Sequence, residues 1–144
     1  MQKTWTLTIA GAAAALLLCG VPVSGHHAFA AEFDSKRPIK LTGTVTKTEW
    51  INPHVWIHLD VKKAGGKIDK WMIEGGPPNA LFRRGFTRNS LPVGTEILVE
   101  GFQAKDGSFK GNGRDLTLAD GKRLFLGSSG TGAPGEKPEP GRGR

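Results

Sequence analysis

Four histidines, the only ones in the chain, occur as two pairs whose positions could support metal binding. His26 and His27 directly follow a segment typical of export signals, and a free N-terminal histidine can bind a cupric ion through its amine and its ring. His54 and His58 are four residues apart in a stretch that alternates polar and apolar side chains. Because imidazole nitrogen suits copper and zinc, all four are candidate metal ligands.

The spacing of the second pair limits how it could bind a metal. On a strand, His54 and His58 point to the same face, about 13 Å apart at a rise of about 3.3 Å per residue. One ion cannot bridge that distance on a straight strand, so each needs another partner, for which His26 or His27 is the candidate. The prediction is a site for a divalent transition metal, copper before zinc. The alternatives are a frayed polar chain start and a polar outer strand face that carries one aromatic side chain.

Other ligand-capable side chains lie near the same stretch. Four of them are candidates for binding a small ligand: Trp50, Asn52, Trp56 and Asp60. Arg83 and Arg84 are adjacent at the end of a predicted helix and could bind an anion, or pair with a carboxylate such as Glu74. Nothing in the spacing of the nearby carboxylates marks a general acid and base pair. The sequence therefore indicates no catalytic residue.

The first 25 residues are predicted to be a signal peptide. Lys3 supplies a positive start, residues 7–21 are apolar apart from Thr8, and the segment ends in small residues at Gly25. Cleavage after Gly25 would leave His26 at the mature N-terminus. Cleavage after Ala30 is the alternative, and it would discard both histidines. The expected location is the periplasm or the outside of the cell, with no stable membrane insertion after cleavage.

The single cysteine, Cys19, lies within the predicted signal peptide. The bulky Leu18 before it differs from the small residue that a lipoprotein cleavage site needs, which argues against a lipid anchor. The mature chain would then hold no disulfide, and a small exported domain without one favours a closed sheet.

Period-two alternation dominates the middle of the chain and predicts strands over residues 41–48, 54–61, 68–74 and 96–104, with a final strand or hairpin over 114–126. A turn over 64–67 joins the second strand to the third. Asn79 is predicted to cap a short helix over residues 79–84 that ends at Gly85.

This order predicts an all-β fold with one short helix, a small OB-like five-stranded barrel. A sandwich is the competing fold. The predicted parts are a signal peptide (1–25), an extended N-terminal segment (26–38), the barrel (39–126) and a disordered Gly/Pro-rich tail (127–144). Apolar residues of one strand phase are predicted to face inward: Val45, Val55, Ile57, Leu59, Ile73, Ile97 and Val99.

The chain has 20 Lys and Arg against 13 Asp and Glu, a formal net charge of +7 at pH 7. The basic residues are scattered along the sequence, and an outside compartment argues against nucleic acid as a partner but leaves cell-surface polyanions open. The expected partners are therefore a small ligand, a metal ion or an envelope protein, and not nucleic acid.

Several short motifs, in their order and spacing, resemble those of a known bacterial family. The segments that carry the resemblance are residues 26–34, 41–45, 49–54, 78–85, 104–108 and 120–125. Together they resemble the exported proteins classed as domain of unknown function 6152, over residues 26 to about 129. The resemblance implies export, a small β-barrel and a histidine pair at the mature start. It implies no catalytic residue.

Three classes of function agree with these observations. The first is an exported binding module, with no catalysis, that uses a histidine-rich face to hold a metal such as copper. The second is a copper-dependent oxidoreductase that uses an N-terminal histidine. The third is an envelope protein that binds partners in a structural role. The missing nucleophile and the lack of a convincing further copper ligand favour the first over the second.

Overall fold

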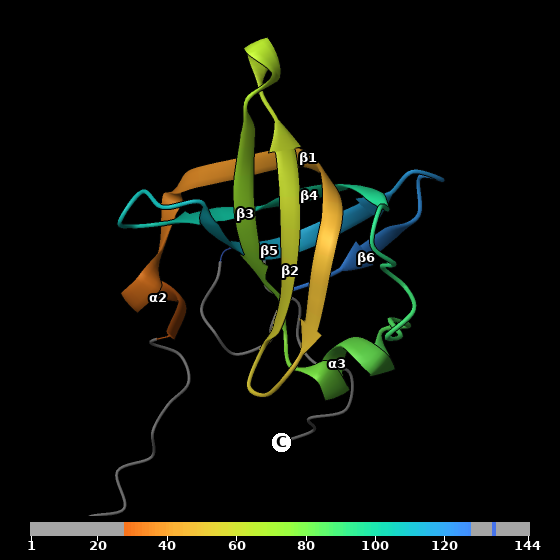
Figure 1. Cartoon of the computed structure of the whole chain (residues 1–144). Helices are drawn as coiled ribbons and strands as arrows, with labels where there is room; N and C mark the ends of the chain where they lie inside the picture. The colour runs from red at the N-terminus through yellow and green to blue at the C-terminus, as the bar shows by residue number, and fades with distance from the viewer. Residues whose placement is uncertain (1–27, 128–133, 135–144) are drawn as a thin grey trace, which may run out of the picture.

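The structure is a computed structural model, and it describes residues 28–127 and residue 134 (Figure 1). The predicted signal peptide, the histidines at positions 26 and 27, and the rest of the Gly/Pro-rich tail lie outside the described residues. The structure therefore bears on the second histidine pair, the sheet and the short helix.

The described residues form six strands, two α-helices and one 3-10 turn. In chain order these are α2 (Ala28–Glu32), β1 (Phe33–Trp50), β2 (Val55–Lys62), η2 (Ala64–Gly66), β3 (Ile68–Glu74), α3 (Pro78–Arg83), β4 (Glu96–Ala104), β5 (Lys110–Leu118) and β6 (Arg123–Phe125). The bounds of β3 and β4 are those that the alternation predicted.

Five of the strands close into a ring. The sheet has the order β3-β2-β1-β4-β5-β6, and a parallel pairing of β3 with β5 joins its two sides. The long β1 strand makes closure possible, because it pairs with β4 along its first part and with β2 along its second. The all-β prediction is confirmed, and the ring has the strand number and connectivity expected of an OB-like barrel. β6 extends the sheet beyond the ring.

The interior of the ring is apolar and follows the predicted strand phase. All seven residues predicted to face inward are buried, at 1% exposure or less. Along β2 the buried and half-buried positions alternate without interruption up to Val61, which fixes one face of this strand to the core and the other to the outside. Trp71 also lies in the main core, whereas Phe102 packs in a second cluster.

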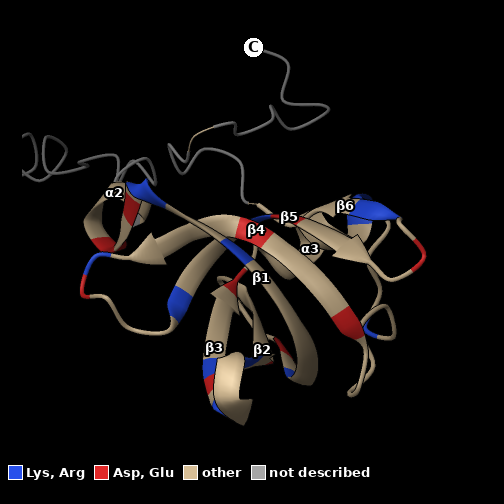
Figure 2. Cartoon of the chain, turned by 90° about the horizontal axis from the view of Figure 1, so that it is seen from above, with Lys and Arg blue, Asp and Glu red and all other residues tan. Residues whose placement is uncertain are grey.

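The second cluster attaches α2 to the outside of the sheet. Phe29 in α2 lies with its ring centre 5.8 Å from that of Phe33 and 5.5 Å from that of Phe102. The backbone N–H of Lys105 donates to the carbonyl of Glu32 over 3.0 Å. The sequence predicted only an extended segment over residues 26–38, and the structure instead has a short helix followed by the start of β1. Figure 2 shows α2 beside β1 and β4, on the other side of the molecule from β6.

The helix α3 is the predicted short helix, but its first turn differs from the prediction. Pro77 occupies the N-cap position, and the side-chain oxygen of Asn79 accepts a hydrogen bond from the N–H of Ala80 at 2.8 Å. The prediction of Asn79 as the cap is therefore wrong, because Pro78 with its fixed φ already suits the first helical position. Gly85 ends the helix with a φ of 90°, as predicted.

Candidate functional site

The outward side of β2 carries the histidines that the sequence singled out. His54 immediately precedes β2, and Trp56 and His58 follow on the half-buried side of the strand. Across the β2–β3 ladder, Trp56 is paired with Glu74 and His58 with Met72. Paired residues in antiparallel strands share a face, so these five residues form one surface, which we call the histidine face.

His54 is held by a buried carboxylate. Its Nδ1 contacts Oε1 of Glu74, whose side chain is only 7% exposed. The hydrogen bond that the His54 ring donates to Glu74 is the main reason that the pKa of His54 is raised, and it outweighs burial, which acts in the opposite direction. The negative charge of Glu32, at the end of α2, raises the same pKa further. The negative charge of Glu32 in α2 therefore acts on a residue of the histidine face.

His58 is held by a carboxylate that is only half-buried. Its Nε2 lies 2.7 Å from Oε2 of Glu49 on β1, and the ammonium of Lys47 lies 2.6 Å from Oε1 of the same carboxylate. The hydrogen bonds from Lys47 and His58, in that order, lower the pKa of Glu49. Glu49 is thus a carboxylate shared by two donors at the surface.

Both contacts have the same chemical consequence for the imidazole rings. A carboxylate that accepts the N–H of one ring nitrogen fixes the tautomer and leaves the lone pair of the other nitrogen for a metal. In His54 the nitrogen left is Nε2, and in His58 it is Nδ1. No described residue hydrogen-bonds to either of these two atoms.

A lysine links the histidine face to α2. The ammonium of Lys110, on β5, lies 5.4 Å from the ring centre of Trp56 and 5.9 Å from that of Phe33. It also contacts the carboxylate of Glu32. The Trp56 ring therefore already faces a cation, and the charge of that cation is balanced in part by Glu32.

Three of the predicted ligand-binding residues lie outside the histidine face. Trp50 stacks on Phe82 of α3 with ring centres 5.0 Å apart, and its ring packs against the main core. Asn52 is exposed in the turn between β1 and β2. Asp60 does lie on the outer side of β2, but it pairs with Lys70 at 3.2 Å. Of the tryptophan, asparagine and aspartate candidates, only Trp56 belongs to the histidine face.

The two arginines lie at the end of α3, where Arg83 is the last helical residue. The guanidinium of Arg84 lies 4.8 Å from the ring centre of Phe125 and donates to the carbonyl of Gly127. These contacts tie α3 to β6 and to the chain that follows it. Glu74, which the sequence offered as a partner for one of the arginines, contacts His54.

Within residues 28–127, no three side chains of His, Cys, Asp or Glu gather closely enough to hold a metal ion. Each strand histidine has one carboxylate beside it. A metal site that used His54 would therefore need a ligand from outside the described residues, and His26 and His27 are the remaining histidines.

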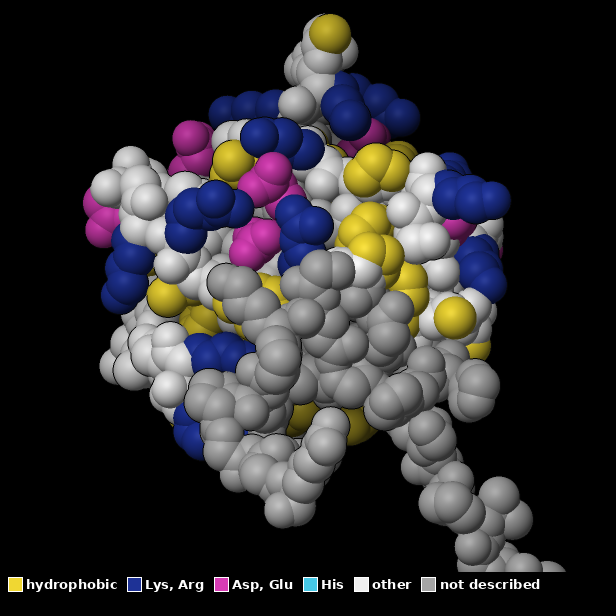
Figure 3. All heavy atoms as spheres, turned by 180° about the vertical axis from the view of Figure 1, so that it is seen from behind, with side chains coloured by type: hydrophobic (Ala, Val, Ile, Leu, Met, Phe, Trp, Pro, Cys, Tyr) yellow, Lys and Arg dark blue, Asp and Glu magenta, His cyan; other side chains and the backbone are white. Residues whose placement is uncertain are grey.

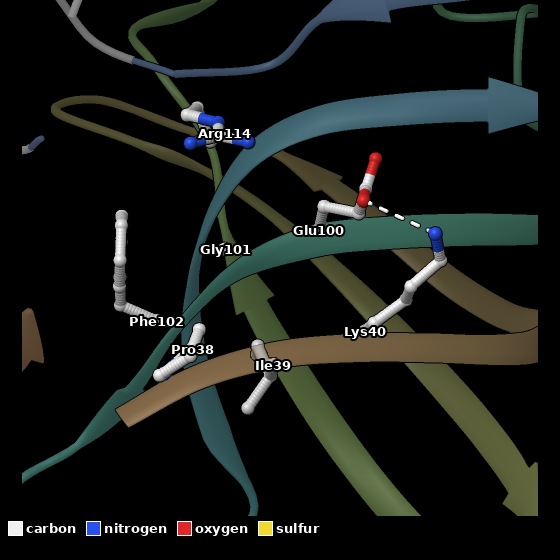
Figure 4. A pocket seen from close by; sticks show the side chains of 7 residues that line it. All are labelled: Pro38, Ile39, Lys40, Glu100, Gly101, Phe102 and Arg114. Carbon is white, nitrogen blue, oxygen red and sulfur yellow. Dashed lines mark ion pairs between the residues drawn. The ribbon is translucent and has the colours of Figure 1, made fainter. Parts of the chain in front are cut away.

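An open pocket lies on another part of the sheet, between β1, β4 and β5 (Figure 4). It has a volume of about 260 Å³ and is lined by Pro38, Ile39, Lys40, Glu100, Gly101, Phe102 and Arg114. The pairing of β1 with β4 shifts register between Phe33 and Pro38, next to the pocket. An ion pair of 3.3 Å between Lys40 and Glu100 borders the pocket. None of its lining residues is a histidine or a residue that the sequence predicted to bind a ligand.

Charged residues on the back of the molecule are intermixed. Figure 3 shows Lys and Arg side chains distributed around acidic ones, without a single basic patch on the visible described surface. This distribution agrees with the scattered positions of the basic residues in the sequence. Within the described residues, no helix has both the length and the apolar character needed to cross a bilayer.

Sequence reasoning missed the groups that orient the histidines. Glu49 and Glu74 are close to histidines in sequence, but nothing in their spacing shows which ring each one contacts. The signal that could have found them is the strand pairing, because Trp56 is aligned with Glu49 on one side and Glu74 on the other. Met72 and Lys110 were missed for the same reason.

The chain matches the model of a family described as "Family of unknown function (DUF6152)" over residues 13–113. This match covers more than half of the 144 residues, and the chain belongs to that family. The resemblance found from the sequence motifs is thereby confirmed. No curated protein and no solved structure matches the chain.

Proposed function

We propose that this protein is an exported binding module, without catalysis, that holds a divalent transition metal, copper before zinc, at the histidine face. The ligands are Nε2 of His54 and the N-terminal histidine pair. The single observation that carries the proposal is the contact between His54 and the buried Glu74, which directs the other ring nitrogen away from the carboxylate. Strands two and three also form the binding face of many OB-folds.

The position of α2 supports a role for the N-terminal histidines. His27 is bonded to the first residue of α2, and a five-residue helix spans only about 7 Å at about 1.5 Å per residue. The far end of this helix carries Glu32, whose charge acts on His54. The second aromatic cluster holds α2 on the sheet with Glu32 close enough to act on His54, and the attachment point of the histidine pair is one short helix away from Glu32.

Packing of α2 also supports cleavage after Gly25 in preference to Ala30. Phe29 is only 4% exposed, and the ammonium of Lys105 contacts the carbonyl of Ala30. Cleavage after Ala30 would remove Phe29 and expose the apolar surfaces of Phe33 and Phe102. Cleavage after Gly25 keeps this cluster and leaves a free amine on His26. The location that goes with the proposal is the periplasm or the cell exterior.

The test is titration of Cu(II) by calorimetry into exported, purified protein and three variants. These are His54→Ala, the double variant His26→Ala with His27→Ala, and His58→Ala as the matched control from the same strand. We expect at least a tenfold loss of affinity in the first two and no change in the third. Imidazole must be neutral to bind metal, and the raised pKa of His54 means that affinity falls with decreasing pH already above about 6.5.

Each other outcome contradicts part of the proposal. Equal affinity in all four proteins would show that no histidine binds Cu(II). A loss confined to the double variant would show an N-terminal chelate that does not involve the barrel. Intact mass measured before the titration reports the cleavage site, and a mass that includes Met1 would contradict export with cleavage.

A further inference from the structure

Met72 is an exposed thioether beside a histidine. It is the only methionine after Met1, and it is 39% exposed on the outer side of β3. The β2–β3 ladder pairs it directly with His58. Side chains paired across antiparallel strands have Cβ atoms about 4.5–5.5 Å apart, which allows one ion to contact both.

His58 is oriented to supply a nitrogen ligand. Because Glu49 contacts Nε2 at 2.7 Å, Nδ1 carries the lone pair that a metal would use. The same carboxylate is held in place by Lys47 from its own strand. A carboxylate that orients a ligating histidine in this way strengthens the ligand and fixes its ring.

Trp56 lies beside the His58 and Met72 pair. It lies two residues before His58 on the same side of β2, and diagonally across the ladder from Met72, within reach of a long side chain. Its ring already faces the ammonium of Lys110 at 5.4 Å. The indole face is therefore positioned to stabilise positive charge near the His58 and Met72 pair.

From this arrangement we propose that His58 Nδ1 and Met72 Sδ bind a soft monovalent cation, cuprous copper, beside the ring of Trp56. Thioether and imidazole together select Cu(I) over the harder divalent ions. The site shares no ligand with the cupric site proposed above, and each can fail without the other. The module would then hold copper in its reduced state on β2 and β3, and in its oxidised state at His54.

Lys110 opposes this binding and provides a test of the position. It is paired with Met72 across the β3–β5 ladder, so its ammonium lies near the proposed ion. Glu32 balances this charge only in part, because its side chain is 47% exposed. Replacement of Lys110 by glutamine removes the repulsion, and we expect the cation to bind several-fold more tightly.

The experiment uses Ag(I), a redox-inert probe for Cu(I), titrated into the full exported protein by calorimetry. The Met72 methyl signal is followed in proton–carbon NMR spectra, and Met72→Leu identifies it. Met72→Leu preserves the size and apolar character of the side chain, and we expect it to lower Ag(I) affinity at least tenfold. We expect a similar loss in His58→Gln, and no change in Asp60→Asn, the control from the same strand side.

Cu(II) titration of the same variants separates the two proposals. We expect Met72→Leu to bind Cu(II) as the unaltered protein does, and His54→Ala to retain its Ag(I) affinity. Unchanged Ag(I) affinity in Met72→Leu, or an Ag(I) complex that leaves the methyl signal in place, would overturn the cuprous site. Weaker Ag(I) binding in Lys110→Gln would also contradict it, because the proposed ion lies beside that charge.

Discussion

The two histidine–glutamate pairs on β2 look alike in sequence but differ in their surroundings. His54 and His58 have nearly equal side-chain exposure, 24% and 25%. Their partners differ, because Glu74 is 7% exposed and Glu49 is 29% exposed and is shared with Lys47. Water can replace a lost partner of Glu49, whereas a buried carboxylate depends on its protein partner. Burial of the partner, more than exposure of the histidine, decides which pair the fold depends on.

The largest expected loss of stability comes from a change in the aromatic cluster under α2. Phe29→Ala removes a buried ring from the contact with Phe33 and Phe102, which costs about 3 kcal/mol of unfolding free energy. Release of α2 also takes Glu32 away from His54. Urea unfolding measures the first effect, and histidine NMR signals measure the second.

The control for this variant is the other histidine. We expect the His54 ring signals to shift in Phe29→Ala and those of His58 to stay in place, because Glu49 and Lys47 both belong to β1. Equal shifts in both rings would show that α2 does not act on one pair alone. A loss of stability below about 1 kcal/mol would contradict the packing of Phe29 itself.

Removal of His54 is expected to lower the free energy of unfolding more than removal of His58. His54→Ala leaves Glu74 buried without its donor, which we expect to cost about 2 kcal/mol of unfolding free energy. His58→Ala breaks a surface pair that water can replace, so we expect a much smaller loss than in His54→Ala. Denaturant unfolding of both variants at pH 6 tests the difference. Equal losses of unfolding free energy in the two variants would show that burial of the glutamate does not determine what each histidine contributes to stability.

The sequence predicted which face of β2 the histidines occupy, but not which glutamate each histidine contacts. Alternation from Val55 to Val61 placed Trp56 and His58 outside, because a strand with one buried face allows only one phase. Which glutamate meets which ring depends on the pairing of β1 with β2 and of β2 with β3, and pairing is set by turn geometry across the chain.

The sequence did not predict the helix α2, and the reason is different. Five residues are fewer than two helical turns, so they show no periodicity that could indicate a helix. Its formation depends on Phe29 packing against Phe102, which lies more than 70 residues further along the chain. By contrast, Gly85 predicted the end of α3 from local chemistry alone, because its positive φ favours glycine.

The smallest expected effect is the pH dependence that His54 gives to stability. Its pKa is raised in the folded protein, so the folded state binds this proton more tightly than the unfolded chain does. The resulting stabilisation is fully present below the unfolded value of about 6.5, and it is lost as pH rises through the folded pKa. Stability of the unaltered protein should therefore fall across this window relative to His54→Gln.

Glu32→Gln sharpens this measurement, because it removes the smallest cause of the raised pKa and leaves Glu74 in place. The folded pKa of His54, measured by NMR titration, should decrease but remain above its ordinary value. The pH range over which stability is lost should then become narrower, because its upper end is set by the folded pKa of His54. An unchanged His54 pKa in Glu32→Gln would mean that α2 and the histidine face are not electrostatically coupled. A decrease as large as that caused by replacing Glu74 would instead mean that the buried carboxylate is not the main partner.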